Sequence, residues 1–226
     1  MPAELPRRMA AAAGLLVVFA VAGALLVAAT WRATAERIEA NERAFLLRAL
    51  EDVLPEGGHD NALAEDVVQV TDEELLGTPA PVNVYRARRD GAPVAVVMTP
   101  VAPDGYSGPI RLLVGIRADG TVSGVRVVSH RETPGLGDKI EVERSDWILD
   151  FAGRRLGAPP AEDWAVKRDG GVFDQFTGAT ITPRAVVKAV KNALIYFQAH
   201  REELLDAPAE AAAREDAGVA VTGEQR

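Results

Sequence analysis

The stretch "IRLLVGIRADGTVSGVRVV", residues 110–128, decides the fold. Two runs rich in Val, Ile and Leu flank Asp119-Gly120, and an Asp-Gly pair in this setting is typical of a β-hairpin turn. The same pattern recurs in "VNVYRARRDGAPVAVVM" (82–98) and in "WAVKRDGGVF" (164–173). Three hairpins together predict an antiparallel sheet.

A final helix is predicted to begin at Pro183, with Thr182 as its N-cap. Apolar residues recur along it at helical spacing, which indicates that one side of the helix packs on the sheet. These residues are Val186, Val187, Val190, Leu194 and Phe197. Helices packed on an antiparallel sheet make the predicted fold class α+β.

Two shorter helices are predicted earlier in the chain. In "SDWILDFAGRRLG" (145–157), Ser145 can cap a helix that carries Trp147, Ile148, Phe151 and Leu156 along one side. Thr71 and Glu74 have the spacing of a capping box, which predicts a brief helix that ends near Gly77.

Residues 10–29, "AAAAGLLVVFAVAGALLVAA", contain no charge and are long enough to cross a membrane as a helix. We predict a transmembrane helix over 10–31, with Trp31 at the interface. A cleaved signal peptide is the alternative, because Arg7-Arg8 forms a basic start and Ala33-Thr34-Ala35 has the pattern of a cleavage site. The apolar run exceeds the usual signal-peptide core of about 7 to 15 residues, which favours a retained anchor.

The anchor divides the chain into predicted segments. Residues 1–9 form a short cytoplasmic tail, 32–59 a helical stalk whose helix ends at Pro55, 60–206 the folded domain and 207–226 a disordered tail. The positive charges on the two sides leave the orientation open. A short tail before a large domain is the usual signal-anchor arrangement, so the domain is expected outside the cytoplasm.

Composition excludes several function classes. The 33 acidic residues outnumber the 25 basic ones, which argues against nucleic acid as a partner. There is no cysteine, and the three histidines are scattered, so thiolate chemistry is excluded and no metal site is expected. No catalytic residue is predicted, because the sequence lacks a phosphate loop, a nucleophile elbow and a dinucleotide fingerprint.

The segment "HRETPGLGDK" (130–139) follows an apolar strand. Pro134-Gly135 fits the centre of a type II turn, and Gly137 allows a second close backbone approach. With Leu136 as apolar cover, such a loop could lie flat against a planar ring. The segment could equally be an ordinary turn at the end of a strand.

The segment "DQFTGATITPRAVVKAV" (174–190) contains more than a helix start needs, because Thr182-Pro183 already provides one. Unpaired backbone N–H groups at a helix start favour a negative charge, and Gly178 permits close backbone approach. The residues therefore suggest an anion site. A tight turn between strand and helix is the alternative.

"DQFTGAT" (174–180) resembles the flavinylation motif Asp-x-x-Ser/Thr-Gly-Ala-Thr, whose last threonine carries FMN through a phosphoester bond. "ETPGLG" (132–137) and "GYSGPI" (105–110) resemble two further motifs of the same FMN-binding domain family. Their order over about 60–205, behind a single anchor, is similar to that in the G subunit of the Rnf (Rsx) ion-translocating electron-transport complex. The chain also resembles the C subunit of the sodium-translocating NADH:quinone reductase, which has the same anchor, domain and attachment motif.

The resemblance implies that an ApbE-family flavin transferase uses FAD to attach one FMN covalently to Thr180. Asp174 would serve recognition by the transferase, and Thr177 and Thr182 would hydrogen-bond the phosphate. The other cofactor-binding residues implied are Gly178, Ala179, Glu132, Thr133, Pro134, Gly135, Leu136, Gly137, Tyr106, Ser107 and Gly108.

The resemblance also implies an electron carrier without turnover of its own, in a complex that moves electrons between ferredoxin and NAD while Na⁺ or H⁺ crosses the membrane. Its partners would be the other membrane and iron–sulfur subunits, the transferase and membrane lipid. The protein would be a single-pass protein of the cell inner membrane with a periplasmic domain. The alternatives are a flavin subunit that delivers electrons to quinone, or a non-redox assembly module that carries no flavin.

Overall fold

The computed structural model describes residues 4–55 and 57–206. The tail predicted over 207–226, and the first three residues of the predicted cytoplasmic tail, lie outside the described residues. The chain divides into two units, Met1–Leu46 and Leu47–Arg226. The first is helical, and the second contains the sheet and the candidate site.

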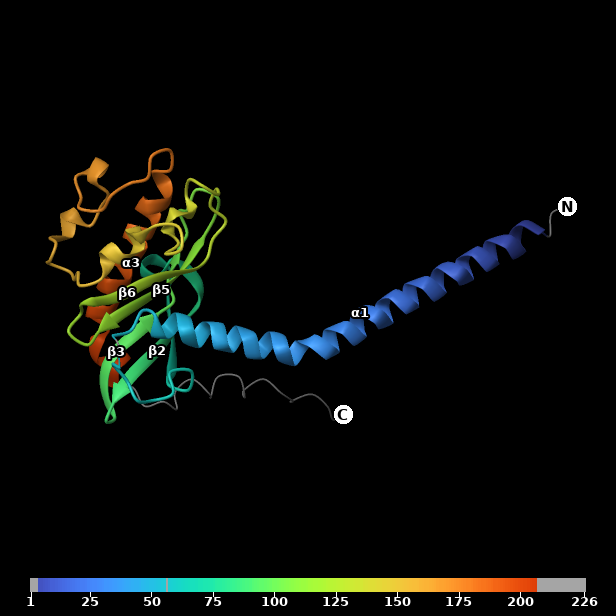
Figure 1. The fold of residues 1–226 in the computed structure, drawn as a ribbon, viewed down its shortest axis with the longest axis horizontal. Coiled ribbons are helices and arrows are strands. Elements are labelled where there is room, and N and C mark those ends of the chain that lie inside the picture. Colours follow the sequence, from blue (N-terminus) through green and yellow to red (C-terminus); the bar gives the residue numbers. More distant parts are fainter. Residues whose placement is uncertain (1–3, 56, 207–226) are drawn as a thin grey trace, which may run out of the picture. The chain divides into compact units, whose positions relative to one another are not determined.

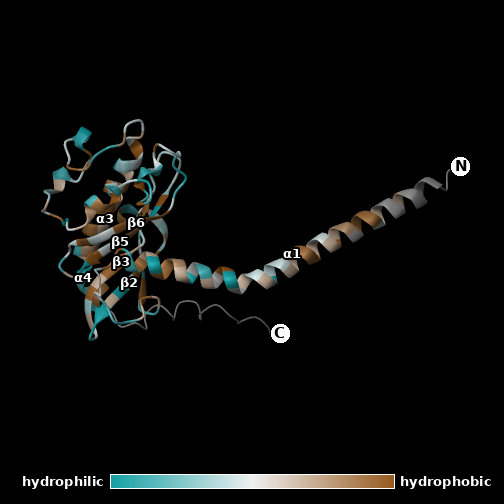
Figure 2. Ribbon diagram, viewed as in Figure 1, coloured by the Kyte–Doolittle hydropathy of each residue, from teal (hydrophilic) through white to brown (hydrophobic). Residues whose placement is uncertain are grey.

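Helix α1 (Glu4–Glu51) is one continuous helix of 48 residues. Its segment Ala13–Ala35 has a mean hydropathy of 2.5 and is long and apolar enough to cross a membrane. Figure 2 shows the change from apolar colours along this segment to hydrophilic ones further along α1. The Thr30 hydroxyl donates to the Leu26 carbonyl at 2.9 Å, so this polar side chain is satisfied within the helix. The helix ends at Glu51, four residues before the predicted stop at Pro55.

The second unit is built on a six-stranded antiparallel sheet (Figure 1). Its neighbours run β1-β2-β3-β5, with β4 continuing along β5 beyond the end of β3 and β6 on the opposite side of β5. The strands are β1 (Val67–Asp72), β2 (Thr78–Arg89), β3 (Ala92–Met98), β4 (Val101–Ala102), β5 (Ile110–Arg117) and β6 (Val122–Ser129). The α+β fold class is confirmed.

Two of the three predicted hairpins are confirmed. β2 and β3 meet through Asp90-Gly91, both with positive φ (52° and 76°), as the tight Asp-Gly turn requires. β5 and β6 are joined through the turn at Asp119-Gly120, where Gly120 has φ 86°.

The third predicted hairpin is wrong. Residues Lys167–Asp169 form a 3₁₀ turn (η4) ended by Gly170, and the flanking Val166 and Phe173 make one parallel bridge. The flanking segments are too short to pair as strands, and their aromatic residues enter the core instead. The Phe173 ring lies 4.5 Å from that of Phe151 and 5.4 Å from that of Trp164, measured between centroids.

Helix α3 (Ile181–Ala199) packs across one face of the sheet, as predicted, with all five predicted apolar residues buried (Figure 1). It begins two residues before the predicted start at Pro183. Along β3, Val96 and Met98 point into this core, whereas Ala95 and Val97 point to the opposite face.

The opposite face of the sheet receives the last turn of α1, where Leu50 and the following Val53 are fully buried. Two glycines allow this approach: a Cβ at Gly115 would lie 2.2 Å from the Val53 carbonyl oxygen, and one at Gly124 2.9 Å from Val53 Cα. Both faces of the sheet are therefore covered within the second unit.

The short helices follow the sequence in part. Helix α2 (Glu73–Leu76) ends at Gly77 as predicted, but its N-cap is Asp72, whose carboxylate accepts from the Leu75 amide at 2.8 Å. Thr71 stands one residue too early for that bond. Ser145 caps η2 (Asp146–Phe151), yet η2 is a short 3₁₀ helix that stops before Leu156. The remaining elements are η1 (Asp138–Ile140), η3 (Ala161–Asp163) and α4 (Arg201–Asp206).

Candidate functional site

A cleft of about 330 Å³ lies at the N-terminal end of α3. It brings together residues from the three sequence motifs, which are far apart in the chain. Its lining residues are Tyr106, Glu132, Thr133, Leu136, Gly137, Gly178, Ala179, Thr180, Ile181 and Thr182. The volume is in the range of small-ligand sites.

Glu132 joins two of the motifs to helix α3. Its side chain is buried, with 4% of the residue exposed, and accepts two hydrogen bonds. The Ser107 amide donates to Oε1 at 2.9 Å, and the Thr182 hydroxyl donates to Oε2. A buried carboxylate needs such donors, so one side chain holds the GYSGPI segment and α3 against the ETPGLG loop.

Two glycines make room for this carboxylate. A Cβ at Gly137 would lie 2.9 Å from Glu132 Cβ and 3.0 Å from the Thr182 hydroxyl oxygen, closer than side chains ordinarily approach. A Cβ at Gly105 would lie 2.2 Å from the Gly108 carbonyl oxygen and 3.0 Å from Glu132 Oε1. Glycine is therefore required here for close packing.

The ETPGLG loop contains the turn that the sequence predicts at Pro134-Gly135. The Leu136 amide donates to the Thr133 carbonyl at 3.1 Å, and Gly135 has φ 78°, as the third position of a type II turn requires. The turn presents Leu136 at the cleft with 42% of the residue exposed.

The flavinylation-like segment forms a second turn of this kind. The Ala179 amide donates to the Phe176 carbonyl at 3.1 Å, and Gly178 has φ 85°. Phe176 is buried against Trp147, with 5.1 Å between ring centroids. The Trp147 indole N–H donates to the Asp174 carbonyl at 2.7 Å, so the N-terminal half of the segment is attached to the core.

Thr180 directly follows this turn and is the N-cap of α3. Its backbone has helical dihedral angles (φ −88°, ψ −21°), and its side chain makes no capping hydrogen bond. Side-chain capping requires an extended backbone, so this hydroxyl is left available at the cleft. The predicted cap, Thr182, lies inside α3 and is fully buried, and its hydroxyl bonds Glu132.

Several predicted site residues do not line the cleft. Thr177 is exposed on the turn, and Ser107 contributes its amide to Glu132. Pro134, Gly135 and Gly108 support turns near the cleft without lining it. The exposed carboxylate of Asp174 pairs with Lys167 at 2.6 Å, away from the lining residues.

Two residues near the cleft were missed by sequence reasoning. Ile181, the first residue of α3, lines the cleft with 44% of its surface exposed. Such exposure is unusual for a large apolar side chain. His130 accepts a hydrogen bond from the Glu132 amide at 3.0 Å. Its position two residues before Glu132 was no signal, because bonds to the amide two residues on are typical of Asn, Asp, Ser and Thr side chains.

The cleft has the electrostatics of a helix start. None of its ten lining residues is basic and Glu132 is acidic, so the groups in the cleft that favour an anion are the unpaired backbone N–H groups of the first turn of α3. Pro183 has no N–H, so Ile181 and Thr182 supply the free amides nearest to Thr180.

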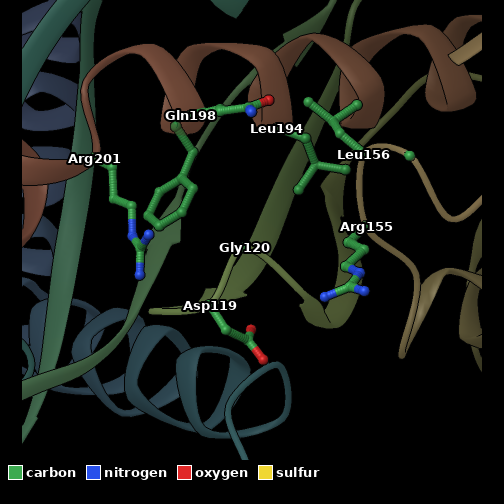
Figure 3. A pocket seen from close by; sticks show the side chains of 9 residues that line it. Asp119, Gly120, Arg155, Leu156, Leu194, Gln198 and Arg201 are labelled. Atoms are coloured by element: carbon green, nitrogen blue, oxygen red, sulfur yellow. The ribbon is translucent and has the colours of Figure 1, made fainter.

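A second hollow, of about 340 Å³, lies beside the C-terminal half of α3 and contains none of the motif residues (Figure 3). Leu194 and Leu156 contribute apolar surface, and Arg155 and Arg201 flank Asp119. The hydrogen bond from the Thr121 amide lowers the pKa of Asp119. We take the first cleft as the candidate site, because residues of all three motifs line it and none lines this hollow.

Comparison with known proteins places the chain in a family. Residues 105–195 match the FMN-binding domain, and residues 1–53 match the RnfG N-terminal region. The G subunit of an ion-translocating oxidoreductase complex from Pseudoalteromonas atlantica is 51% identical over 193 residues, which are 85% of this chain and 90% of that protein. The chain belongs to the family of G subunits of these complexes.

Two other relatives of the same name extend the match. The G subunit from Vibrio cholerae is 51% identical over 86% of this chain and 92% of its own length. The G subunit from Pseudomonas aeruginosa is 51% identical over 95% of this chain and 100% of its own length. In this member of the G-subunit family, the FMN-binding match runs from the GYSGPI segment into α3 and so includes every residue that lines the cleft.

Proposed function

We propose that this protein is the electron-carrying subunit of a membrane-bound complex, with one FMN joined to Thr180 by a phosphoester bond. The complex would couple electron transfer between ferredoxin and NAD to the movement of Na⁺ or H⁺. Membership of the G-subunit family and the match to the FMN-binding domain support the coarser part of this proposal.

The observation that carries the proposal is the state of the Thr180 side chain. This residue stands at the start of α3 and lines the cleft, but its hydroxyl is not used to cap the helix. A phosphate on that oxygen would lie next to the free amides of the first turn, where the helix dipole favours negative charge. Thr182 is unsuited to carry it, because its hydroxyl is buried and bonded to Glu132.

The remaining lining residues fit a flat ring system. Leu136, Ile181 and Tyr106 expose 42%, 44% and 68% of their surfaces and give the cleft apolar walls. Gly137 and Gly178 add no side chain, which lets backbone approach the ligand. When bound, FMN would supply one- and two-electron transfer, and the protein's part is to orient it and adjust its potential.

Attachment requires a separate enzyme, for which an ApbE-family flavin transferase with FAD as donor is the proposed partner. The Thr180 oxygen would attack the FMN phosphorus of FAD and form the new P–O bond. The bond to the AMP phosphate would break, AMP would leave, and the hydroxyl proton would pass to a base of the transferase. Asp174 is exposed beside Lys167 and accessible to that enzyme.

The apolar segment of α1 supports a single-pass anchor in the cell inner membrane, and we propose that the folded domain is periplasmic. Covalent attachment has a physical advantage there, because a tethered cofactor cannot dissociate into the surrounding volume. The tether also keeps it at high local concentration near its redox partners, which we propose to be the other membrane and iron–sulfur subunits.

The test is to produce the full chain with and without an active flavin transferase and to measure flavin fluorescence in a denaturing gel. We expect fluorescence only with the transferase, loss in Thr180→Ala, and retention in Thr71→Ala, which changes an exposed threonine outside the three motifs. A dark wild-type band beside a fluorescent known substrate of the same enzyme would reject the carrier role and favour a non-redox assembly module. Identification of the electron acceptor as quinone would instead support the related reductase subunit.

A further inference from the structure

His130 stands next to the cleft and makes two side-chain hydrogen bonds. Its side chain is 9% exposed and lies between the end of β6 and the segment around η1. The Glu132 amide lies 3.0 Å from Nδ1, and Glu141 Oε1 lies 2.8 Å from Nε2. Both ring nitrogens are therefore in use.

These contacts define the protonation state of the ring. A backbone N–H can only donate, so Nδ1 must be the acceptor and carries no proton. A neutral imidazole then carries its single proton on Nε2, which donates to Glu141. An imidazolium would place a second N–H against the Glu132 amide. The contact with Glu141 is thus a hydrogen bond of a neutral histidine and not an ion pair.

We infer that His130, as the neutral Nε2–H tautomer, is a positioning residue that holds the Glu132 carboxylate between Ser107 and Thr182. Its Nδ1 fixes the backbone of Glu132, from which the side chain reaches the Ser107 amide at 2.9 Å and the Thr182 hydroxyl. Without that contact, the Glu132 backbone could shift and both bonds would loosen. The side-chain bonds of His130 go to Glu132 and Glu141, so its effect on Ser107 and Thr182 passes through Glu132.

The other end of this chain of contacts is also held. Arg144 Nε lies 3.7 Å from Glu141 Oε2 and 3.7 Å from Asp138 Oδ2. Asp138 is buried and follows Gly137 of the cleft directly. Glu141 therefore has Arg144 as a second partner beside the His130 ring.

Two substitutions at position 130 separate the two bonds. His130→Asn keeps an acceptor at the place of Nδ1, because an Asn side chain readily bonds the amide two residues on, but it loses Glu141. His130→Gln keeps a donor that can reach Glu141. The Gln side chain is one methylene longer than that of Asn, so its amide group lies too far out to accept from the Glu132 amide. Both variants avoid a large cavity, and circular dichroism checks that each one folds.

The experiment measures amide hydrogen exchange by NMR on the full chain in detergent, without flavin. In His130→Gln we expect the Glu132 amide to exchange about three- to tenfold faster, the effect of losing one hydrogen bond, and the Ser107 amide to be accelerated with it. In His130→Asn we expect wild-type exchange at both amides. In wild type, the ¹⁵N shifts of His130 should report the Nε2–H tautomer.

Unchanged Ser107 exchange in His130→Gln, or equal acceleration in both variants, would overturn the positioning role. A protonated Nδ1 in the wild-type protein would overturn the assignment of the tautomer. The relevance of His130 to cofactor binding rests on the proposed function. Because this experiment uses no flavin, the positioning role and the proposed function can each fail without the other. In flavin-loaded protein, His130→Gln should shift the flavin absorption spectrum while His130→Asn leaves it near wild type.

Discussion

The hydroxyl of Thr182, in the first turn of α3, donates a hydrogen bond to the carboxylate of Glu132, fifty residues earlier in the chain, and both side chains are buried. This bond connects the helix that starts at the cleft with the loop that forms its wall. A buried carboxylate that loses a donor keeps the cost of its desolvation, so the contact should matter for stability as well as for the shape of the cleft.

Thr182→Ala should lower the free energy of unfolding by about 1–3 kcal/mol, the cost of a buried acceptor left unsatisfied. Thr177→Ala is the matched control, because Thr177 is exposed and its loss should change stability by less than about 0.5 kcal/mol. Urea denaturation of the two variants makes the comparison. Equal stabilities would mean that the bond to Glu132 contributes nothing.

Trp147→Phe should slow incorporation of flavin by the transferase, because it removes the indole bond at 2.7 Å to the Asp174 carbonyl. Trp164→Phe is a close control: Trp164 is also buried, and its indole nitrogen has no hydrogen-bond partner among the described residues. Both variants lose packing, but only Trp147→Phe removes a hydrogen bond that holds residues 174–180. Initial rates of flavin incorporation that fall equally in the two would contradict this role.

Tyr196 predicts a stability change at alkaline pH. Burial, with the charges of Glu203 and Asp72, raises the pKa of Tyr196 above its ordinary value of 10.0. Because the pKa of Tyr196 is higher in the folded than in the unfolded state, the group contributes to folding stability below about pH 10. That contribution is lost as the pH rises through the folded-state pKa. Tyr196→Phe should therefore lose less stability than wild type between neutral pH and pH above about 10. Parallel losses in urea midpoints across this range would contradict the assignment.

The local parts of the fold follow from the sequence. The Asp-Gly pairs at Asp90 and Asp119 each join two long apolar runs, and both form the predicted hairpins. The same dipeptide at Asp169 forms no hairpin, because the flanking runs are short and their aromatic side chains pack into the core. A turn signal is reliable only when both strands around it are long enough to pair.

The candidate site was harder to predict, because its connections cross long stretches of chain. Thr182 has the residue type of a helix cap, and only the fold shows that Glu132 takes its hydroxyl instead. Resemblance to known motifs brought the segments that line the cleft into consideration, yet it could not show that Glu132 bonds Ser107 and Thr182. A buried bond between residues fifty positions apart leaves no periodic pattern in one sequence.

Thr180 is the residue that we propose carries the cofactor. The most direct measurement is tandem mass spectrometry of the peptide that contains Thr180, after production of the full chain with an active flavin transferase. We expect this peptide to gain the mass of one FMN less one water, with fragment ions that assign the addition to Thr180, and Thr180→Ala to abolish the gain. An unmodified Thr180 in the presence of active enzyme, or FMN on Thr177 or Thr182 instead, would show that Thr180 is not the attachment residue.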